Sequence, residues 1–395
     1  MHIEQEVTLS QLELLYQDLT SPSGGDLSPS ISYKYTNAFG LEAALIQLIA
    51  SWQRIHPDGR VAIDGEPVDY PDLLRKACKH PSNIAACYFG ERFSSFSDDS
   101  FSYSRAATLK LIEPMLSAMY REDFRAENES EALALLCFRN HPAEYLPSFY
   151  EFPAPGNIRS KDQFRDLVIK ILRTKIQEHK PQLSPEAFAT SVGPLLHELI
   201  KNTDEHSLTD ENGNFYQKGI RGIIFKLATL NRGDLLSGYS GKNPRLTTYL
   251  NGRLGDVGRN TTQLTFLEVS VIDTGPGLAR RWISSKRSIP INKLSSISIN
   301  DERKAVIDCF RKYMTTKPSE SSGMGLSAVL HHLHRLKGFL RLRTGRLALF
   351  QALDQENPHL EFSPQDWDKN FRELPEAAGT AFTLCFPIAT ERAKN

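Results

Sequence analysis

The sequence predicts an α/β protein, and three observations support this fold class. Between residues 41 and 90, helical and strand-like apolar patterns alternate. Two amphipathic helical patterns fill much of residues 161–206. Apolar, β-rich runs follow at 219–232, 265–273 and 379–387. The chain has 395 residues, which is enough for two domains or one large domain.

Composition narrows the class of protein. The 47 Lys and Arg residues balance the 47 Asp and Glu residues, so the net charge does not indicate nucleic acid or an anionic membrane as a partner, although a local patch is not excluded. We find no signal peptide and no run of about 18 apolar residues, so we expect a cytoplasmic protein without membrane contact. Five cysteines without CxxC spacing indicate reduced thiols rather than disulfides or a zinc site; they are Cys78, Cys87, Cys137, Cys309 and Cys385.

The first 155 residues are predicted to form an α/β-to-helical domain of unknown role. After a loop or mobile arm at 21–30, the patterns predict a helix at 41–56, a strand at 59–64, a helix at 70–80 and a buried strand at 83–90. Helices are then expected at 105–120 and 129–140. Pro153, Pro155 and Gly156 lie close together and mark a candidate domain boundary, with a rigid surface loop as the alternative.

The second helix after this boundary has two chemically different faces. Its first residues combine a capping Ser184 with Pro185 in the first turn. One face is apolar and carries Val192, Leu196, Leu199, Ile200 and Thr203. The other carries Glu198, Asn202, Glu205 and His206. Taken alone, such a polar face is most simply a solvated one.

Three further segments combine glycines with polar residues. A strand ends in "DTGPG" at 273–277, where glycines permit close approach and Asp273 can accept a hydrogen bond from an amino group. A Ser/Gly-rich loop containing Lys317 leads through "GMG" at 323–325 into a helix, whose N-terminus suits phosphate oxygens. "GTAFTLCFP" at 379–387 reads as a strand. Each of these segments is weak evidence by itself.

The four segments in this order resemble the ATP-binding domain of the gyrase, chaperone, histidine kinase and MutL (GHKL) superfamily, in its histidine-kinase-like ATPase branch. The resemblance covers about residues 160–390. It implies a two-layer α/β sandwich with a mixed sheet, the Bergerat ATP-binding fold, over a domain at 156–395. Two insertions depart from the family pattern, at about 233–262 and 279–305.

The resemblance also implies roles for individual residues around ATP and Mg²⁺. Asn202 corresponds to the magnesium ligand, Asp273 to the acid that reads adenine, and Glu198 to the base that activates water in hydrolytic members. His206 corresponds to a residue near the phosphates, with a polar residue at the helix end as the alternative. The remaining expected contacts are Gly275 and Gly277 at the adenine, Lys317, Gly323, Met324, Gly325 and Leu326 at the phosphate lid, and Thr380 beside the adenine.

Both insertions have alternative interpretations. The first is locally basic, which indicates either a partner surface or a solvated loop; its cations are Arg232, Lys242, Arg245, Arg253 and Arg259. The second leads into a predicted helix at 301–314, which we regard as a mobile element that responds to nucleotide.

Three functions are compatible with these features. The first is an ATP-dependent hydrolytic switch that acts on an unidentified protein partner. The second is a soluble protein kinase that phosphorylates its own histidine or a serine of another protein, although the helix at 161–180 offers only His179 as an acceptor. The third is a non-catalytic nucleotide-binding scaffold. A homodimer is common in the superfamily, but no coiled-coil heptads argue for one here.

Overall fold

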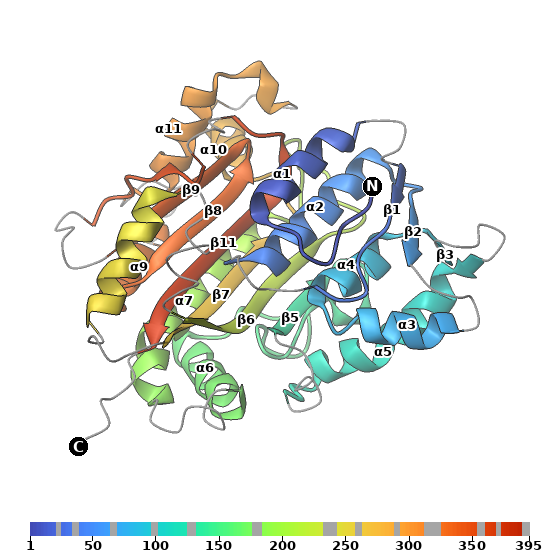
Figure 1. Cartoon of the computed structure of the whole chain (residues 1–395), viewed down its shortest axis with the longest axis horizontal. Helices are drawn as coiled ribbons and strands as arrows, with labels where there is room; N and C mark the ends of the chain where they lie inside the picture. The colour runs from blue at the N-terminus through green and yellow to red at the C-terminus, as the bar shows by residue number, and fades with distance from the viewer. Residues whose placement is uncertain are drawn as a thin grey trace.

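A computed structural model shows a mixed α/β protein built around one large sheet (Figure 1). It describes residues 1–20, 25–33, 39–63, 69–95, 102–124, 132–175, 184–231, 243–256, 263–287, 293–311, 325–353, 360–368 and 373–388. Statements about absent features below refer to these residues.

The first third of the chain is mainly helical, with short strands. Its elements are α1 (Leu9–Asp18), β1 (Asp26–Leu27), α2 (Leu41–Ile55), β2 (Arg60–Ile63), α3 (Tyr70–Ala77), α4 (Pro81–Phe89), β3 (Arg92–Ser95), β4 (Ser102–Ser104), α5 (Arg105–Tyr120), β5 (Ala132–Phe138) and the 3₁₀ turn η3 (Pro142–Glu144). The strands β1 to β4 form a small sheet of their own in sequence order.

The remaining elements alternate between helices and longer strands. They are α6 (Lys161–Lys175), α7 (Pro185–His206), β6 (Ile220–Asn231), α9 (Pro244–Asp256), β7 (Gln263–Asp273), α10 (Leu278–Arg287), η4 (Leu294–Ser296), α11 (Ile299–Cys309), α12 (Gly325–Arg335), β8 (Phe339–Gly345), β9 (Leu347–Ala352), β10 (Gln365–Asp366) and β11 (Ala377–Ile388).

The large sheet has seven strands in the order β10-β9-β8-β11-β7-β6-β5. Every neighbouring pair in it is antiparallel, so the expectation of a mixed sheet is wrong for this sheet. The last strand, β11, lies between β8 and β7, so the C-terminal part of the chain completes the centre of the sheet rather than an edge.

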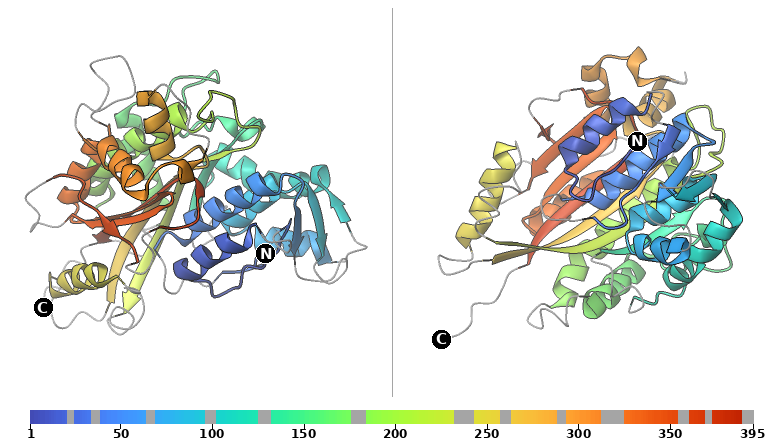
Figure 2. Two further views of the ribbon diagram at one scale, coloured as in Figure 1. Left: turned by 90° about the horizontal axis from the view of Figure 1, so that it is seen from above. Right: turned by 45° about the vertical axis from the view of Figure 1, so that its right-hand side comes forward.

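Helices cover both faces of this sheet, which corrects the expected two-layer arrangement. In Figure 2, α6, α7, α10, α11 and α12 lie on one face, and α1, α2 and α9 lie on the other. The physical reason is visible in the strands, because every residue of β5 and β8 is buried. A strand that is buried on both sides needs a packing partner on both sides.

The N-terminal region forms part of the large sheet's structure. The strand β5 pairs with β6 along its length, from Ala132 opposite Lys226 to Phe138 opposite Ile220. The helix α2 packs against β11 and β7. The sheet and its helical cover therefore extend across the boundary predicted near residue 155, and Figure 1 shows α3, α4 and α5 beside the β5 edge.

Most predicted elements agree with the structure, but two are of the wrong type. The segment predicted as a buried strand at 83–90 lies mostly in helix α4, and the segment predicted as a helix at 129–140 contains strand β5. In α4 every residue is buried, so the polar face that identifies a helix is absent. In β5 the Ala- and Leu-rich sequence favours a helix, but pairing with β6 determines a strand.

The described part of the first insertion is integrated into the core. Helix α9 contributes Leu246, Tyr249 and Leu250 to a cluster with Phe266 and Phe339 of the sheet. Two of the predicted basic residues, Arg245 and Arg253, lie on α9, whereas Arg232, Lys242 and Arg259 lie outside the described residues. The second insertion forms α10, η4 and α11, and the two helices pack against each other.

All five cysteines are free thiols, as expected. Among the helices described, none is both long and apolar enough to cross a membrane.

Candidate functional site

A row of polar side chains crosses five neighbouring strands near one end of the large sheet. Strand register places Arg221 of β6 beside Asp273 of β7, and Asp273 beside Thr380 of β11. The row continues to Cys137 of β5 and to Thr344 of β8. Because directly paired residues project from the same face of an antiparallel sheet, all five side chains share one face. Arg221 Nη2 lies 3.4 Å from Asp204 Oδ1 of α7, which identifies this as the face that α7 covers.

Asp273 is a buried carboxylate at the centre of this row, with 8% of its surface exposed. The backbone N–H of Gly275 donates to Asp273 Oδ1 at 2.8 Å. Burial raises the pKa of Asp273 to about 6, and the opposing influences of Gly275, Arg54 and Thr380 do not cancel this effect. At neutral pH the group is therefore mainly a carboxylate, which can accept a hydrogen bond. The predicted site residues Asp273 and Thr380 are direct neighbours.

The glycines of the "DTGPG" turn allow backbone segments to pack closely. A Cβ atom on Gly275 would lie 2.6 Å from Ser207 Cα at the end of α7. Gly277 adopts φ +84°, where a side chain is strained, and a Cβ there would lie 3.1 Å from Thr344 Oγ1. Gly379 on β11 has φ +68°, and its Cβ would lie 2.0 Å from the carbonyl oxygen of Asp273. These glycines hold the turn against α7, β8 and β11.

Arg54, at the end of α2, is a residue that the motifs did not reveal. Its Nη2 donates to the carbonyl oxygens of Thr274 and Gly275, the latter at 2.9 Å. The guanidinium lies 4.5 Å above the ring of Tyr216. The N-terminal helix α2 therefore contacts the "DTGPG" turn directly through Arg54. In the sequence, the only signal for this role is one arginine at the end of an apolar helix.

Helix α7 forms as its sequence predicts. Ser184 accepts a hydrogen bond from the Ala187 N–H, and Pro185 occupies the first turn. The predicted apolar face is buried; it comprises Val192, Leu196, Leu199, Ile200 and Thr203. The opposite face is partly exposed and carries Glu198, Asn202, Glu205 and His206.

Glu198 is held in an ion pair. Its Oε1 lies 2.7 Å from Lys161 Nζ at the start of α6 and 3.5 Å from Nδ1 of its neighbour His197. These two groups, His197 foremost, lower the pKa of Glu198 to about 2 although partial burial opposes them. The carboxylate is thus ionised at neutral pH, and it is a weak base.

Asn202 lies one helical turn beyond Glu198 on the same face. Its Nδ2 is buried and has no hydrogen-bond partner among the described residues. A buried amide without a partner is unusual, and a group rich in oxygen acceptors beside α7 would satisfy it. His206 is the last residue of α7 and is partly exposed.

The predicted phosphate lid falls largely outside the described residues. Lys317, Gly323 and Met324 belong to the range 312–324, which the structure does not describe. Gly325 is the first residue of α12, and Leu326 is 8% exposed within the core. Helix α12 packs against α7. His332 on α12 has a pKa that is lowered by burial, with smaller contributions from cations that include Lys161.

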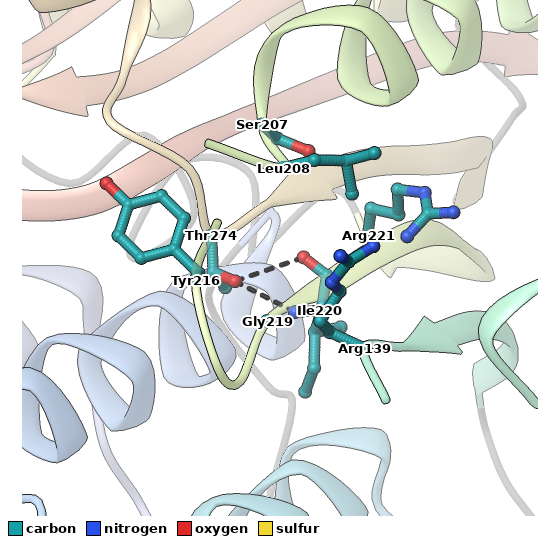
Figure 3. A pocket seen from close by; sticks show the side chains of 8 residues that line it. All are labelled: Arg139, Ser207, Leu208, Tyr216, Gly219, Ile220, Arg221 and Thr274. Atoms are coloured by element: carbon teal, nitrogen blue, oxygen red, sulfur yellow. Dashed lines mark hydrogen bonds between the residues drawn. The ribbon is translucent and has the colours of Figure 1, made fainter. Parts of the chain in front are cut away.

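A small hollow adjoins the polar row (Figure 3). It has room for about one water molecule and is lined by Arg139, Ser207, Leu208, Tyr216, Gly219, Ile220, Arg221 and Thr274. Thr274 Oγ1 closes its base by accepting from the Ile220 N–H at 2.8 Å. Small-molecule sites usually begin at roughly 300 Å³, so this hollow alone does not define a nucleotide site.

Within the described ranges, no group of three or more His, Cys, Asp or Glu side chains is arranged to hold a metal ion. No known family model matches the sequence, and no curated protein is significantly similar to it.

Proposed function

We propose that the chain is an ATP-binding protein of the GHKL superfamily with a Bergerat-type nucleotide site, working as an Mg²⁺-dependent hydrolytic switch on a partner protein. The observation that carries the proposal is the adjacency of Asp273 and Thr380 on paired strands, beneath the helix that bears Glu198 and Asn202. Asp273 and Thr380 lie far apart in the sequence and are paired on the face that α7 covers, and α7 ends beside the "DTGPG" turn, where Gly275 packs against Ser207.

The residues present fit the proposed ligands. Asp273 is buried, aligned by the Gly275 N–H, and able to accept from the adenine amino group, with the Thr380 hydroxyl beside it. Asn202 is the residue that would hold Mg²⁺ through its amide oxygen, and its buried Nδ2, which has no partner among the described residues, would donate to a phosphate oxygen. When bound, Mg²⁺ would neutralise phosphate charge and orient the nucleotide.

The environment of Glu198 favours a slow reaction. Its position suits a base that takes a proton from water, but efficient general bases have pKa values near the working pH. With a pKa of about 2 and an ion pair to Lys161, Glu198 is poorly matched to fast proton transfer. Slow turnover is what a switch requires, because the bound state must last long enough to act on a partner.

Arg54 provides a structural route for such a switch. It joins α2 to the backbone carbonyls of the "DTGPG" turn, which is the proposed adenine contact. A rearrangement of this turn would therefore alter the contacts of α2. Nucleotide would shift this equilibrium only to the extent that it binds one arrangement better than the other.

A histidine autokinase is less well supported. Such an enzyme needs an acceptor histidine on a dimerising helix pair before the ATP-binding domain, and α6 contains no histidine. Moreover, α6 packs on α7 as part of the same layer. The predicted alternative acceptor, His179, lies outside the described residues.

The direct test supplies γ-labelled ATP and Mg²⁺ to the full chain and follows nucleotide binding, free phosphate and label on the protein. Asp273→Asn should abolish ATP binding by removing the carboxylate. Asn202→Ala should abolish the Mg²⁺ dependence of ATP binding. Glu198→Ala should retain binding and lose free phosphate. Glu186→Ala is the matched control, because Glu186 is an exposed acid on the same helix that pairs with Arg173.

Each outcome separates the three functions. Free phosphate that depends on Glu198 supports the switch, whereas label retained on the chain or on added protein indicates a kinase. Binding without either product indicates a scaffold. If wild-type protein binds no ATP, the nucleotide assignment as a whole is wrong.

A further inference from the structure

A pair of cysteines lies between α3 and α4, and the proposed nucleotide function does not use it. Cys78 is the residue that ends α3, and Cys87 lies within α4. Their Sγ atoms are 3.6 Å apart, both residues are buried, and both are free thiols. Their spacing along the chain is not that of a CxxC motif, so only the fold reveals the pair.

The junction between the two helices holds the thiols together. Asn83, near the start of α4, donates from its Nδ2 to the carbonyl oxygen of Ala77 at 2.9 Å, which ties α4 to the end of α3. The Ser82 N–H donates to the buried Glu42 carboxylate of α2 at 2.7 Å, which fixes the start of α4 on the core. The contact between the sulfur atoms therefore follows from how the fold joins α3 to α4.

The other three cysteines provide a comparison within the same chain. Cys137 lies in β5, Cys309 ends α11 and Cys385 lies in β11. The Cys309 thiol donates to the carbonyl oxygen of Ala305. Within the described residues, none of these three contacts another thiol. Chemistry that needs two thiols is therefore open to Cys78 and Cys87.

A short movement would join the two sulfur atoms. A disulfide has an S–S distance of about 2.05 Å, so the sulfur atoms need to approach each other by about 1.5 Å. Helix α3 is suited to this movement, because it is short and exposes Asp72 and Arg75 to solvent. Cys78 is followed directly by the exposed Lys79, so local opening at the end of α3 uncovers the thiol to a small solute.

The pair is unreactive while α3 stays closed. Contact with Cys87, followed by burial, raises the pKa of Cys78 well above its usual range. Because the thiolate is the reacting form of cysteine, the closed pair resists oxidation. Both the formation and the reduction of a disulfide here would therefore require α3 to open.

We propose that Cys78 and Cys87 form a reversible disulfide in the presence of hydrogen peroxide, and that this linkage fastens α3 to α4. The thiolate of one cysteine attacks a peroxide oxygen, becomes a sulfenic acid and releases water. The thiol of the other cysteine then attacks the sulfenic sulfur, forms the S–S bond and releases a second water. Two thiols are oxidised, one peroxide is reduced, and the two thiol protons leave in the water. The cross-link restrains the unfolded chain and so stabilises the folded protein.

Peptide mapping of the full chain tests this proposal. The folded protein is treated with hydrogen peroxide, the peroxide is removed, and the chain is unfolded in an alkylating reagent. Trypsin cleaves after Lys79 and so places Cys78 and Cys87 in different peptides. These two peptides should be linked to each other, whereas the remaining cysteines should be alkylated. Dithiothreitol before alkylation should restore both thiols.

Three variants accompany the wild type. Cys78→Ala and Cys87→Ala each remove one partner and should leave the other thiol unlinked. Cys137→Ala is the matched control, because Cys137 is equally buried and has no thiol neighbour in the described part of the chain; it should keep the linkage. Oxidation should raise the Tm of the wild type and of this control by about 3 °C, and it should leave the Tm of the other two variants unchanged.

Three results would overturn the proposal. The first is peroxide-treated wild-type protein in which Cys78 and Cys87 are both alkylated. The second is linkage of either residue to another cysteine, or to a second chain, as often as to its neighbour. The third is a linkage that forms between them without raising the Tm, which would show that it does not fasten α3 to α4.

Discussion

At the scale of single residues, the ionised form of Asp273 opposes folding. Its folded-state pKa of about 6 lies above the ordinary value of 3.8, so the folded protein holds this proton more tightly than the unfolded chain. The stabilisation that comes from the protonated Asp273 side chain is therefore fully present below about pH 4, and it is lost as the pH rises towards 6. A buried carboxylate that destabilises the fold at neutral pH is typical of a functional group.

We predict that Asp273→Asn removes this pH dependence. One pKa unit corresponds to about 1.36 kcal/mol. The variant's free energy of unfolding, relative to that of the wild type, should therefore be roughly 2–3 kcal/mol higher at pH 7 than at pH 4. Urea unfolding of both proteins at several pH values measures the difference. A difference that is constant with pH would show that Asp273 has an ordinary pKa.

Glu198 shows the opposite behaviour. Its pKa is lowered to about 2, so it stabilises the fold above its ordinary pKa of 4.5, and this stabilisation is lost as the pH falls towards 2. Lys161 is one cause, and its side chain is 54% exposed. An ion pair with one exposed partner contributes at most about 1 kcal/mol to stability, so its larger effect is on the basicity of Glu198.

We therefore predict that Lys161→Met raises the pKa of Glu198 while lowering stability by less than about 1 kcal/mol. Carboxyl-detected NMR titration, assigned with Glu198→Gln, measures the pKa. Lys170→Met is the control, because Lys170 lies on the same helix and pairs with Glu122 instead. Equal Glu198 pKa values in the wild type and Lys161→Met would show that the ion pair does not govern this carboxylate.

At the scale of elements, Gly379 determines how β11 enters the sheet. Its φ of +68° and the 2.0 Å approach of a Cβ to the Asp273 carbonyl leave no room for a side chain. The neighbouring residue, Thr380, is the one that pairs with Asp273. Displacement of β11 at this point would separate two residues of the proposed adenine site.

Gly379→Ala should accordingly lower the free energy of unfolding by at least about 3 kcal/mol, through backbone strain and the loss of pairing. Gly252→Ala is the matched control, because Gly252 lies on helix α9 with open space around its Cα and should gain about 0.5–1 kcal/mol. Denaturant unfolding compares both with the wild type. A loss below about 1 kcal/mol in Gly379→Ala would contradict this account of the turn.

The two elements whose type was predicted wrongly, β5 and α4, are both fully buried, whereas helices α6 and α7 each have an exposed face. Helices α6 and α7 show a clear apolar stripe, and capping residues identify the start of α7. Strand β5 and helix α4 are buried on every side, so neither has a polar face from which its period can be read. Short apolar runs of this kind are ambiguous until their partners are known.

The candidate site was predictable to the same partial extent. Asp273, Thr380, Glu198 and Asn202 lie in motifs with glycines or helical spacing, and the sequence identifies them. Arg221 and Arg54 reach the site only through strand register and through packing of α2. Neither is marked by its neighbours in the sequence.

At the scale of the whole molecule, the N-terminal region is bound to the large sheet by specific polar contacts. Gly40 N–H donates to Glu268 Oε1 at 3.0 Å, Gln47 Nε2 donates to the Arg343 carbonyl at 3.1 Å, and the Ala378 N–H donates to Ser51 Oγ at 2.8 Å. All three contacts join α2, or the residue before it, to strands that follow residue 260.

The two parts of the chain should therefore be unable to fold separately. A fragment of residues 156–395 would lose β5 from the edge of the sheet and α1 and α2 from one face. It would expose strands whose residues are buried on both sides, which favours aggregation.

We predict that fragments 1–155 and 156–395 are each insoluble or unfolded when expressed alone, and that coexpression recovers a soluble complex. Near-UV circular dichroism and hydrogen exchange measure folding. A soluble 156–395 fragment with protected β7 and β11 amides would show instead that the C-terminal region is an independent domain, and that α2 only caps it.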